Sequence, residues 1–426
     1  MNALRALPGT IRDSAVMLGR GMLRDLRRRN VRDAGPQVPR TGFDPTDPAA
    51  IANPWPQLAR LREQRVVVNE RLNVWMLSRY DDVVAAARAH ETLSSDSGIL
   101  LRSMPMPGVV STDEPDHSRL RRITAASFTP GAVRRLEDAI NELAKPAIGA
   151  LMGGETVDAV STLAAPLPIA AIALILGVDE SRRAEFQRYS EVFRSVFAVS
   201  SLSEVTRSMG RVLPGMLAMR SLVLDDLDRR VGLETDDVFG RVRKALDAGD
   251  MSMLEALTAA LILLVAGSET TTNLLGILLT QLAREPELYD RLRQNRELIA
   301  PATEEALRWG CPVQWVGRTT LRPYTVGDIT IPARSRMVLF YAGANHDPGR
   351  FARPEDFDID RDPVGHLSFG HGAHFCMGAH LARLEVRVVV NQLLDAAERI
   401  ELAGPVTWTT TPSLSGPTCV PIRVTK

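Results

Sequence analysis

One cysteine of the chain stands in a setting that suits binding of a metal through sulfur. Cys376 lies in the sequence Phe369-Gly370-His371-Gly372-Ala373-His374-Phe375-Cys376-Met377-Gly378. Three glycines in this stretch allow a tight loop whose backbone can approach a large flat ligand. A helical-looking run follows, so we expect the sulfur at a helix N-terminus, where free N–H groups lower the pKa of a thiol. A thiolate so placed can hold a haem iron.

The stretch resembles the Phe-Gly-x-Gly-x-His-x-Cys-x-Gly pattern of the cytochrome P-450 family of haem-thiolate monooxygenases. The resemblance covers roughly residues 41–426 and implies the P-450 fold, with Cys376 as the ligand of a haem b iron. It also implies that Phe369, Gly370, His374 and Gly378 surround the cofactor. The alternative for a lone cysteine is a buried structural residue.

A second pair of residues has the chemistry of proton transfer. Glu269 and Thr270 follow Gly267 within a long apolar helix expected from Met253 to about Arg284. Glycine beside β-branched threonines is poor helix material, so we expect strain or opening there. An acid followed by an alcohol can relay protons, and the resemblance implies this role. The alternative is that Thr270 bonds to the carbonyl four residues earlier and that Glu269 pairs with an arginine.

Two further groups gain meaning from the resemblance. Glu305 and Arg308 lie three apart on one helix face, a weak signal alone. The family's pattern implies that they meet Arg361 in a buried structural ion network. The carboxylates of haem need cations or donors at one edge of the pocket. The resemblance implies that these are His117, Arg121, Arg318 and His374.

The substrate pocket is expected to be apolar, with Gln314 as a polar anchor. Surface residues near the thiolate side are expected to dock an electron donor, since no flavin or nucleotide-binding stretch occurs. The expected lining residues are Leu100, Leu101, Met104, Met106, Leu263, Ala266, Gly267, Val313, Gln314, Trp315, Val316 and Leu414. The expected docking residues are Arg119, Arg122, Arg383 and Arg387.

Composition excludes several classes of protein. The 426 residues carry 51 basic and 51 acidic side chains, so no net charge favours nucleic acid. Three scattered cysteines are too few for a disulfide framework or a zinc site, and a reducing, cytoplasmic location is expected. The longest apolar stretch is too short to span a bilayer. A monomer is expected.

The first 40 residues differ from the rest of the chain. They hold nine arginines against three aspartates, a net charge of +6 (9 − 3). Ile11, Leu18, Met22 and Leu26 fall on one helical face. Such a segment can lie on an anionic membrane surface. The alternatives are a poorly ordered extension or a segment packed on the body of the protein.

The remaining pattern predicts a mainly α fold with small β-sheets in one domain, residues 41–426, after the basic extension 1–40. Two strands are expected at residues 66–68 and 74–77. Mostly helices are expected from Tyr80 to about Arg308, and one of them runs from Thr129 through Leu151. Further strands are expected at residues 313–320, 325–331 and 399–424. The predicted function is a monooxygenase of apolar small molecules (lipid, steroid, terpenoid or polyketide) that receives electrons from a ferredoxin and its reductase. A peroxide-driven haem peroxygenase and a non-catalytic haem sensor are the alternatives.

Overall fold

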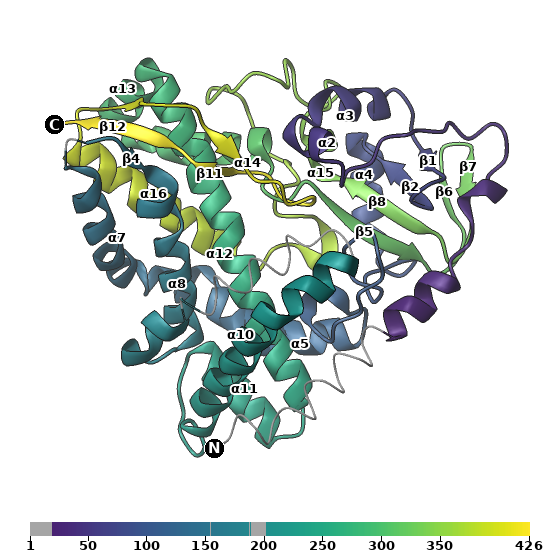
Figure 1. The fold of residues 1–426 in the computed structure, drawn as a ribbon, viewed down its shortest axis with the longest axis horizontal. Helices are drawn as coiled ribbons and strands as arrows, with labels where there is room; N and C mark the ends of the chain where they lie inside the picture. Colours follow the sequence, from purple (N-terminus) through teal and green to yellow (C-terminus); the bar gives the residue numbers. More distant parts are fainter. Residues whose placement is uncertain (1–18, 154, 187, 189–201) are drawn as a thin grey trace.

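The computed structural model describes residues 19–153, 155–186, 188 and 202–426 (Figure 1), and helices dominate these residues. The helices are α2 (Pro48–Ala52), α3 (Trp55–Arg62), α4 (Tyr80–Arg88), α5 (Asp116–Ala125), α6 (Pro130–Arg134), α7 (Glu137–Leu151), α8 (Pro166–Leu176), α10 (Leu202–Asp228), α11 (Val238–Asp247), α12 (Met253–Arg284), α13 (Pro286–Gln294), α14 (Ile299–Gly310), α15 (Tyr341–Asn345) and α16 (Ala379–Ala396). Residues 19–26 are also helical, and Val160–Ala164 form a π-helix. Short 3₁₀ turns lie at Val31–Asp33, Val109–Ser111, Ala126–Phe128, Glu180–Arg182, Arg296–Leu298 and Gly372–His374.

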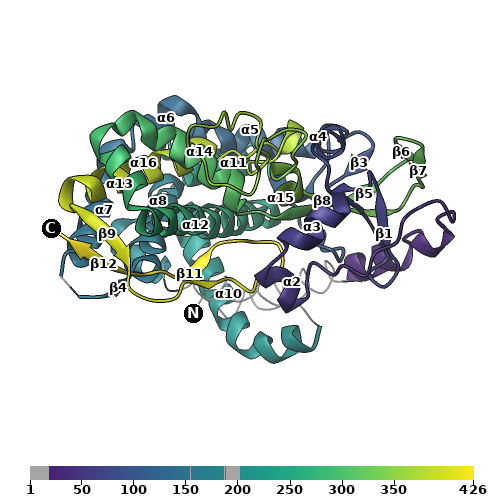
Figure 2. The same ribbon diagram turned by 90° about the horizontal axis from the view of Figure 1, so that it is seen from above.

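Helix α12 is the central element of the fold. Ser252 caps its first turn in a capping box with Glu255, which satisfies two free N–H groups. Most of its 32 residues are apolar, and most beyond Gly267 are buried. By length and composition α12 is the one helix of the described residues that could cross a membrane. Its burial instead indicates a core helix, which passes through the middle of the molecule in Figure 2.

The strands form one larger sheet and three small ones. The larger sheet has the order β1-β2-β8-β5-β3, in which only β2 and β8 run parallel. The smaller sheets are β4-β12-β9, β10-β11 and β6-β7. The strands are β1 (Val67–Asn69), β2 (Val74–Leu77), β3 (Leu93–Ser94), β4 (Val157–Asp158), β5 (Trp315–Thr320), β6 (Tyr324–Val326), β7 (Ile329–Ile331), β8 (Arg336–Phe340), β9 (Arg399–Leu402), β10 (Thr407–Trp408), β11 (Pro417–Cys419) and β12 (Pro421–Thr425).

Two clusters of buried apolar residues hold these parts together. The larger cluster joins α7, α8, α12, α14 and α16. The smaller cluster surrounds the five-stranded sheet together with α3, α4 and α15. In Figure 1 the helical part lies to the left of and below the sheet. The mainly α prediction is therefore confirmed.

The structure divides some predicted elements and adds others that were not predicted, such as β3, β4 and α15. The helix expected from Thr129 through Leu151 is divided into α6 and α7. Thr129 does cap α6, and its side chain accepts a hydrogen bond from the N–H of Ala132. Strand β8 was not predicted, because all five of its residues are buried and show no alternation of apolar and polar side chains.

Candidate functional site

The cysteine loop lies between a 3₁₀ turn and the start of α16. The N–H of Cys376 donates to the carbonyl of Phe369 over 2.9 Å, which closes the loop. Gly370 and Gly372 have φ values of 70° and 73°, the left-handed region that glycine adopts without strain. A Cβ atom at Gly372 would come within 2.8 Å of the Ala87 carbonyl oxygen. Two glycines are therefore needed for this loop, and Cys376 lines the cavity beside it.

The thiol of Cys376 does not have the pKa that its sequence predicts. Burial raises the pKa, while backbone N–H groups of Gly378 and Ala379 and the nearby Arg121 and Arg383 act in the opposite direction. The expectation of a lowered pKa was wrong: the side chain of Cys376 is exposed to the cavity, yet the protein atoms around it remove enough hydration to outweigh the helix N-terminus. A metal ion bound at the sulfur would reverse this balance, since a coordinating thiol is deprotonated.

The cavity beside Cys376 has a volume of about 270 Å³ and mostly apolar walls. The cysteine loop forms one side, with Phe369, Gly370 and Gly378, and α12 contributes another. The predicted pocket residues that line it are Leu263, Ala266, Gly267, Val313 and Val316. Thr270 lines it as well.

Four basic side chains meet at one edge of this cavity. The rings of His117 and His374 lie 4.3 Å apart, and His374 lines the cavity with Arg121 and Arg318. Arg121 donates to the carbonyl of Phe375 over 2.8 Å, and Arg318 donates to that of Gly317 over 2.9 Å. The structure therefore brings together the four residues that the sequence analysis assigned to haem carboxylates.

The basic side chains at this edge of the cavity favour binding of an anion. The pKa of His374 falls to about 3 because of burial and because of the charges of Arg318, His117 and Arg121. The Nε2 atom of His117 is buried and has no hydrogen-bond partner among the described residues. Its Nδ1 atom lies 3.2 Å from Glu114. Two carboxylates at this edge would supply the missing partners, so the residues present fit a haem.

Helix α12 passes the cavity without a break. Thr270 donates its hydroxyl to the carbonyl of Ala266 over 2.6 Å, and Ser268 and Thr272 make the same bond to carbonyls four residues earlier. The expected opening of the helix was therefore wrong, because the hydroxyls of Ser268, Thr270 and Thr272 bond within a continuous helix. Glu269 is half-buried and is not among the described residues that line the cavity.

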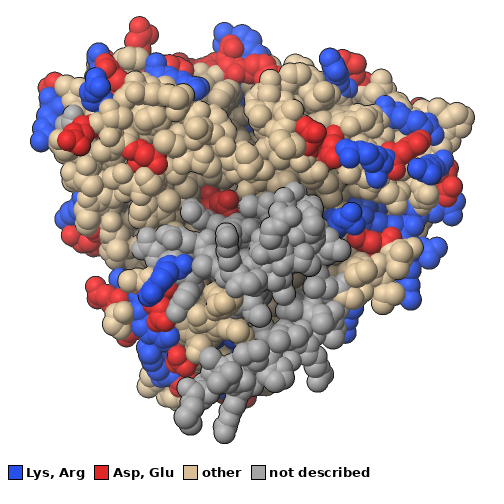
Figure 3. Space-filling view, in the orientation of Figure 1, with Lys and Arg blue, Asp and Glu red and all other residues tan. Residues whose placement is uncertain are grey.

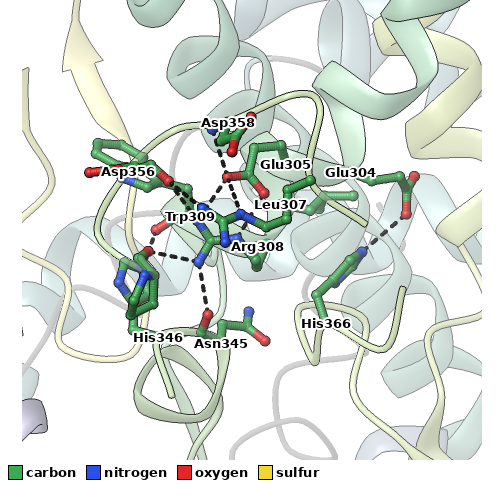
Figure 4. A network of polar contacts seen from close by, with 12 residues as sticks. Glu304, Glu305, Leu307, Arg308, Trp309, Asn345, His346, Asp356, Asp358 and His366 are labelled. Carbon is green, nitrogen blue, oxygen red and sulfur yellow. Dashed lines mark hydrogen bonds and ion pairs between the residues drawn. The ribbon is translucent and has the colours of Figure 1, made fainter. Parts of the chain in front are cut away.

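A buried ion network joins α14 to residues 345–361, which precede the cysteine loop in the sequence (Figure 4). Arg308 binds both carboxylate oxygens of Glu305 at 2.8 Å, and Arg361 Nε lies 3.3 Å from Glu305. Arg308 also donates to the carbonyls of Asn345, Pro354 and Asp356. The structure thus brings the three predicted residues together and ties α14 to the segment before the cysteine loop.

The other predicted pocket residues lie elsewhere. Leu100, Leu101, Met104 and Met106 do not line the cavity in the described chain. Gln314, Trp315 and Leu414 line a second hollow of about 80 Å³.

The prediction of Gln314 as a polar anchor of the cavity was wrong. Its amide donates to the carbonyl of Cys311 over 3.1 Å. Side chains alternate along β5, so Val316 and Arg318 face the cavity while Trp315 faces away.

Several lining residues were not predicted. Ile172 of α8 lies against Gly267, where a Cβ atom would come within 2.9 Å of its Cδ1 atom. Ala259 and Ile262 line the cavity from α12. Ala259 lies four residues before Leu263, and Ile262 lies four residues before Ala266, a helical spacing that could have identified them.

The arginines proposed for docking are mostly engaged. Arg119 binds Asp116 and Glu255, and Arg387 binds Glu137. Arg383 binds Glu304, and it lines with Arg387 a surface groove of about 470 Å³. The groove also includes the basic residues Arg134, Arg296 and His380 and the acids Glu137, Glu297 and Glu304. Arg122 is exposed, and no ion pair is found for it within the described residues.

Comparisons with known proteins agree with one another. The family model "Cytochrome P450" matches residues 235–398. The beta-dihydromenaquinone-9 omega-hydroxylase of Mycobacterium tuberculosis is 37% identical over 386 residues, which are 90% of this chain and 79% of that protein.

Solved structures show the same similarity over most of the chain. Cytochrome P450 CYP109Q5 from Chondromyces apiculatus is 32% identical with a TM-score of 0.78, over 90% of this chain and 98% of the other. The myxobacterial cytochrome P450 CYP267B1 in complex with myristic acid is 30% identical, also with a TM-score of 0.78, over 89% and 98% of the chains.

Proposed function

The chain belongs to the cytochrome P450 family, and on that premise we propose that it is a monooxygenase of apolar, lipid-like molecules. The family makes it an oxidoreductase that incorporates oxygen, with a haem b whose iron is bound by a cysteine. The observation that carries the proposal is one cavity lined by the Cys376 sulfur, the Thr270 hydroxyl and a cluster of basic side chains. We assign residues 41–426 to this catalytic domain and the enzyme to the cytoplasm.

In this proposal the cysteine loop and the basic edge hold the cofactor. Cys376 is the iron ligand, and the turn made by Gly370 leaves room for a flat ring system. His117, Arg121, Arg318 and His374 bind the two haem carboxylates. The low pKa of His374, about 3, reflects positive charges that such carboxylates would offset. When bound, the haem supplies the chemistry of oxygen activation.

Thr270 and Glu269 are proposed to handle protons. The Thr270 hydroxyl lines the cavity and donates to the Ala266 carbonyl, so a rotation about one bond would turn its proton into the cavity. Glu269, the adjacent half-buried acid, would return a proton to that hydroxyl from solvent. A hydroxyl held in this way also positions water at the cavity wall.

The substrate class follows from the cavity walls and from the relatives. Apolar side chains such as Leu263, Val313 and Val316 line the cavity together with Cys376. A relative is named as a hydroxylase of a menaquinone, and a neighbour binds myristic acid. These names support a substrate with a long hydrocarbon chain or ring system.

Electrons are proposed to arrive from a ferredoxin, itself reduced by a ferredoxin reductase. The groove next to α16 is lined by arginines and glutamates together, whereas the exposed Arg122 has no ion pair within the described residues and suits an acidic partner. Because Arg383 and Arg387 are already paired with acids, Arg122 is the better test residue. Charge reversal at Arg122 should slow reduction and weaken its salt dependence. An unchanged rate would remove this side chain from the interface.

The function is tested with haem-loaded protein, a ferredoxin and its reductase. Fatty acids and isoprenoid quinones are screened for a shift of the iron spin state, and hits are incubated under labelled O₂. Incorporation of one labelled atom is the expected result. Thr270→Ala should lower product formation about a hundredfold, whereas Thr272→Ala, on the same helix but outside the cavity lining, should not. Turnover with peroxide alone that survives Thr270→Ala would favour the peroxygenase.

A further inference from the structure

The N-terminal helix exposes an unusual amount of apolar surface. Met22 is 67% exposed, Leu23 54% and Leu26 81%. Large apolar side chains exposed singly are ordinary, but three of them within five residues form a patch. The other large exposed apolar side chains of the described chain are Val231, Leu233, Met253, Leu321, Val364 and Phe375, on other segments.

The opposite side of this helix is fixed to the body of the protein. Arg24 pairs with Asp96, and Arg28 donates to the carbonyl of Leu101 and to the hydroxyl of Ser103, each over 3.0 Å. Asp25 accepts from the N–H of Ser103 over 3.1 Å. The exposed side is therefore held in one orientation. The sequence left open whether the first 40 residues bind a membrane, are poorly ordered or pack on the body of the protein. Residues 19–40 pack on the body. Ile11 and Leu18 lie outside the described residues.

Among the described residues, the charges around the apolar patch that have no ion-pair partner are all positive. Arg20, Arg27 and Arg32 are exposed and form no ion pair within the described residues. Asp33, the exposed acid nearby, is paired with Arg29 at 3.2 Å. Figure 3 shows basic side chains, with acidic ones among them, at the right-hand side of the molecule, where the N-terminal helix lies in Figure 1. Exposed arginines that flank apolar side chains are typical of segments that bind anionic lipid surfaces.

We propose that this patch (Met22, Leu23 and Leu26, with Arg20, Arg27 and Arg32) docks on an anionic lipid bilayer. The apolar side chains enter the boundary between headgroups and acyl chains, and the arginines contact lipid phosphates. The patch is formed by a fixed helix, so binding requires little ordering of the chain.

Docking also brings the cavity close to the bilayer. The residues that anchor the helix, Asp96, Leu101 and Ser103, flank Ile99, and Ile99 lines the haem cavity. The loop over the cavity would thus lie at the lipid surface, where an apolar substrate is concentrated. This last step depends on the proposed function, whereas docking itself does not.

The experiment measures co-sedimentation of the full-length, haem-loaded protein with vesicles. One set contains phosphatidylcholine, and the other contains phosphatidylcholine with phosphatidylglycerol. Three variants are compared with the natural chain: the apolar variant Met22→Ser/Leu23→Ser/Leu26→Ser, the charge variant Arg20→Gln/Arg27→Gln/Arg32→Gln, and the control Val231→Ser/Leu233→Ser/Val364→Ser. All nine side chains are exposed, so folding should be retained, which the haem absorption and the unfolding midpoint confirm.

We expect binding to the anionic vesicles only, decreasing with salt. The charge variant should bind roughly a hundredfold more weakly, because each arginine near an anionic surface contributes about 1 kcal/mol. The apolar variant should lose binding. The control variant should bind like the natural chain. Absence of vesicle binding by the natural chain would overturn the proposal, as would equal binding by the apolar variant. A dimer that the apolar variant abolishes, without vesicle binding, would assign the patch to a second copy of the chain. Because binding is measured without turnover, its failure leaves the monooxygenase proposal untouched.

Discussion

In the ion network that joins α14 to the segment before the cysteine loop, substitution of Glu305 should lower the stability of the protein most. Glu305 is 1% exposed and Arg308 is 0% exposed. The carboxylate accepts two bonds from Arg308 at 2.8 Å, one from the N–H of Asp358 at 2.9 Å and one from Arg361 at 3.3 Å. Glu305→Gln keeps the shape of the side chain, removes its charge and turns two N–H donors towards groups that are themselves donors.

The size of the effect follows from the burial of the pair. Removing one partner of a buried ion pair costs about 3–5 kcal/mol, because the remaining charge is left without compensation. Arg308 keeps its bonds to the carbonyls of Asn345, Pro354 and Asp356. We therefore expect the lower end, about 3 kcal/mol of unfolding free energy.

The assay is equilibrium unfolding of the haem-loaded protein in urea, followed by circular dichroism and by the haem absorption. Glu297→Gln, an exposed glutamate just before α14, is the matched control and should change the unfolding free energy by less than about 0.5 kcal/mol. A shift of the Glu305→Gln midpoint no larger than that of the control would refute the reasoning. In that case the network would add nothing to stability beyond its carbonyl bonds.

Two further predictions concern the groove and the cavity. Burial alone would raise the pKa of Glu304, but bonds from Arg383 and His366 lower it from 4.5 to about 2. The stability that ionised Glu304 contributes is therefore present above pH 4.5 and is lost as the pH falls towards 2. The melting temperature of Glu304→Gln should thus decline less over that range than that of the natural chain. An identical decline of the two melting temperatures would exclude this contribution. Gly267→Val should press on Ile172 and narrow the cavity. Spectral titrations of Gly267→Val should then show weaker binding of long fatty acids and unchanged binding of imidazole. Equal weakening of both ligands would contradict the narrowing of the cavity.

The sequence predicts the parts of the site that depend on local rules. The loop around Cys376 needs left-handed glycines and a following helix, and both are visible as residue types. Glu305 and Arg308 lie one turn apart, so their meeting requires only a helix. Arg361 is distant in sequence, and the family resemblance alone supplied it.

The features that were missed depend on packing that the sequence does not display. The pKa of Cys376 is governed by enclosure from several elements, which outweighs the local helix N-terminus. Trp315 faces away from the cavity because side chains alternate along β5, and β5 is paired with β8, whose buried residues carry no strand signal of their own. Gln314 precedes β5, and its amide donates to the carbonyl of Cys311. Ile172 reaches the cavity only because Gly267 leaves room for it.

The central claim is that Cys376 binds the haem iron as a thiolate. The direct measurement is the absorption spectrum of the reduced protein with carbon monoxide, for the natural chain and for Cys376→His. Thiolate ligation gives a Soret band at distinctly longer wavelength than a neutral ligand gives. We predict that band for the natural chain and its replacement by the shorter-wavelength band in Cys376→His. A natural chain without the long-wavelength band, or a variant that keeps it, would contradict the assignment.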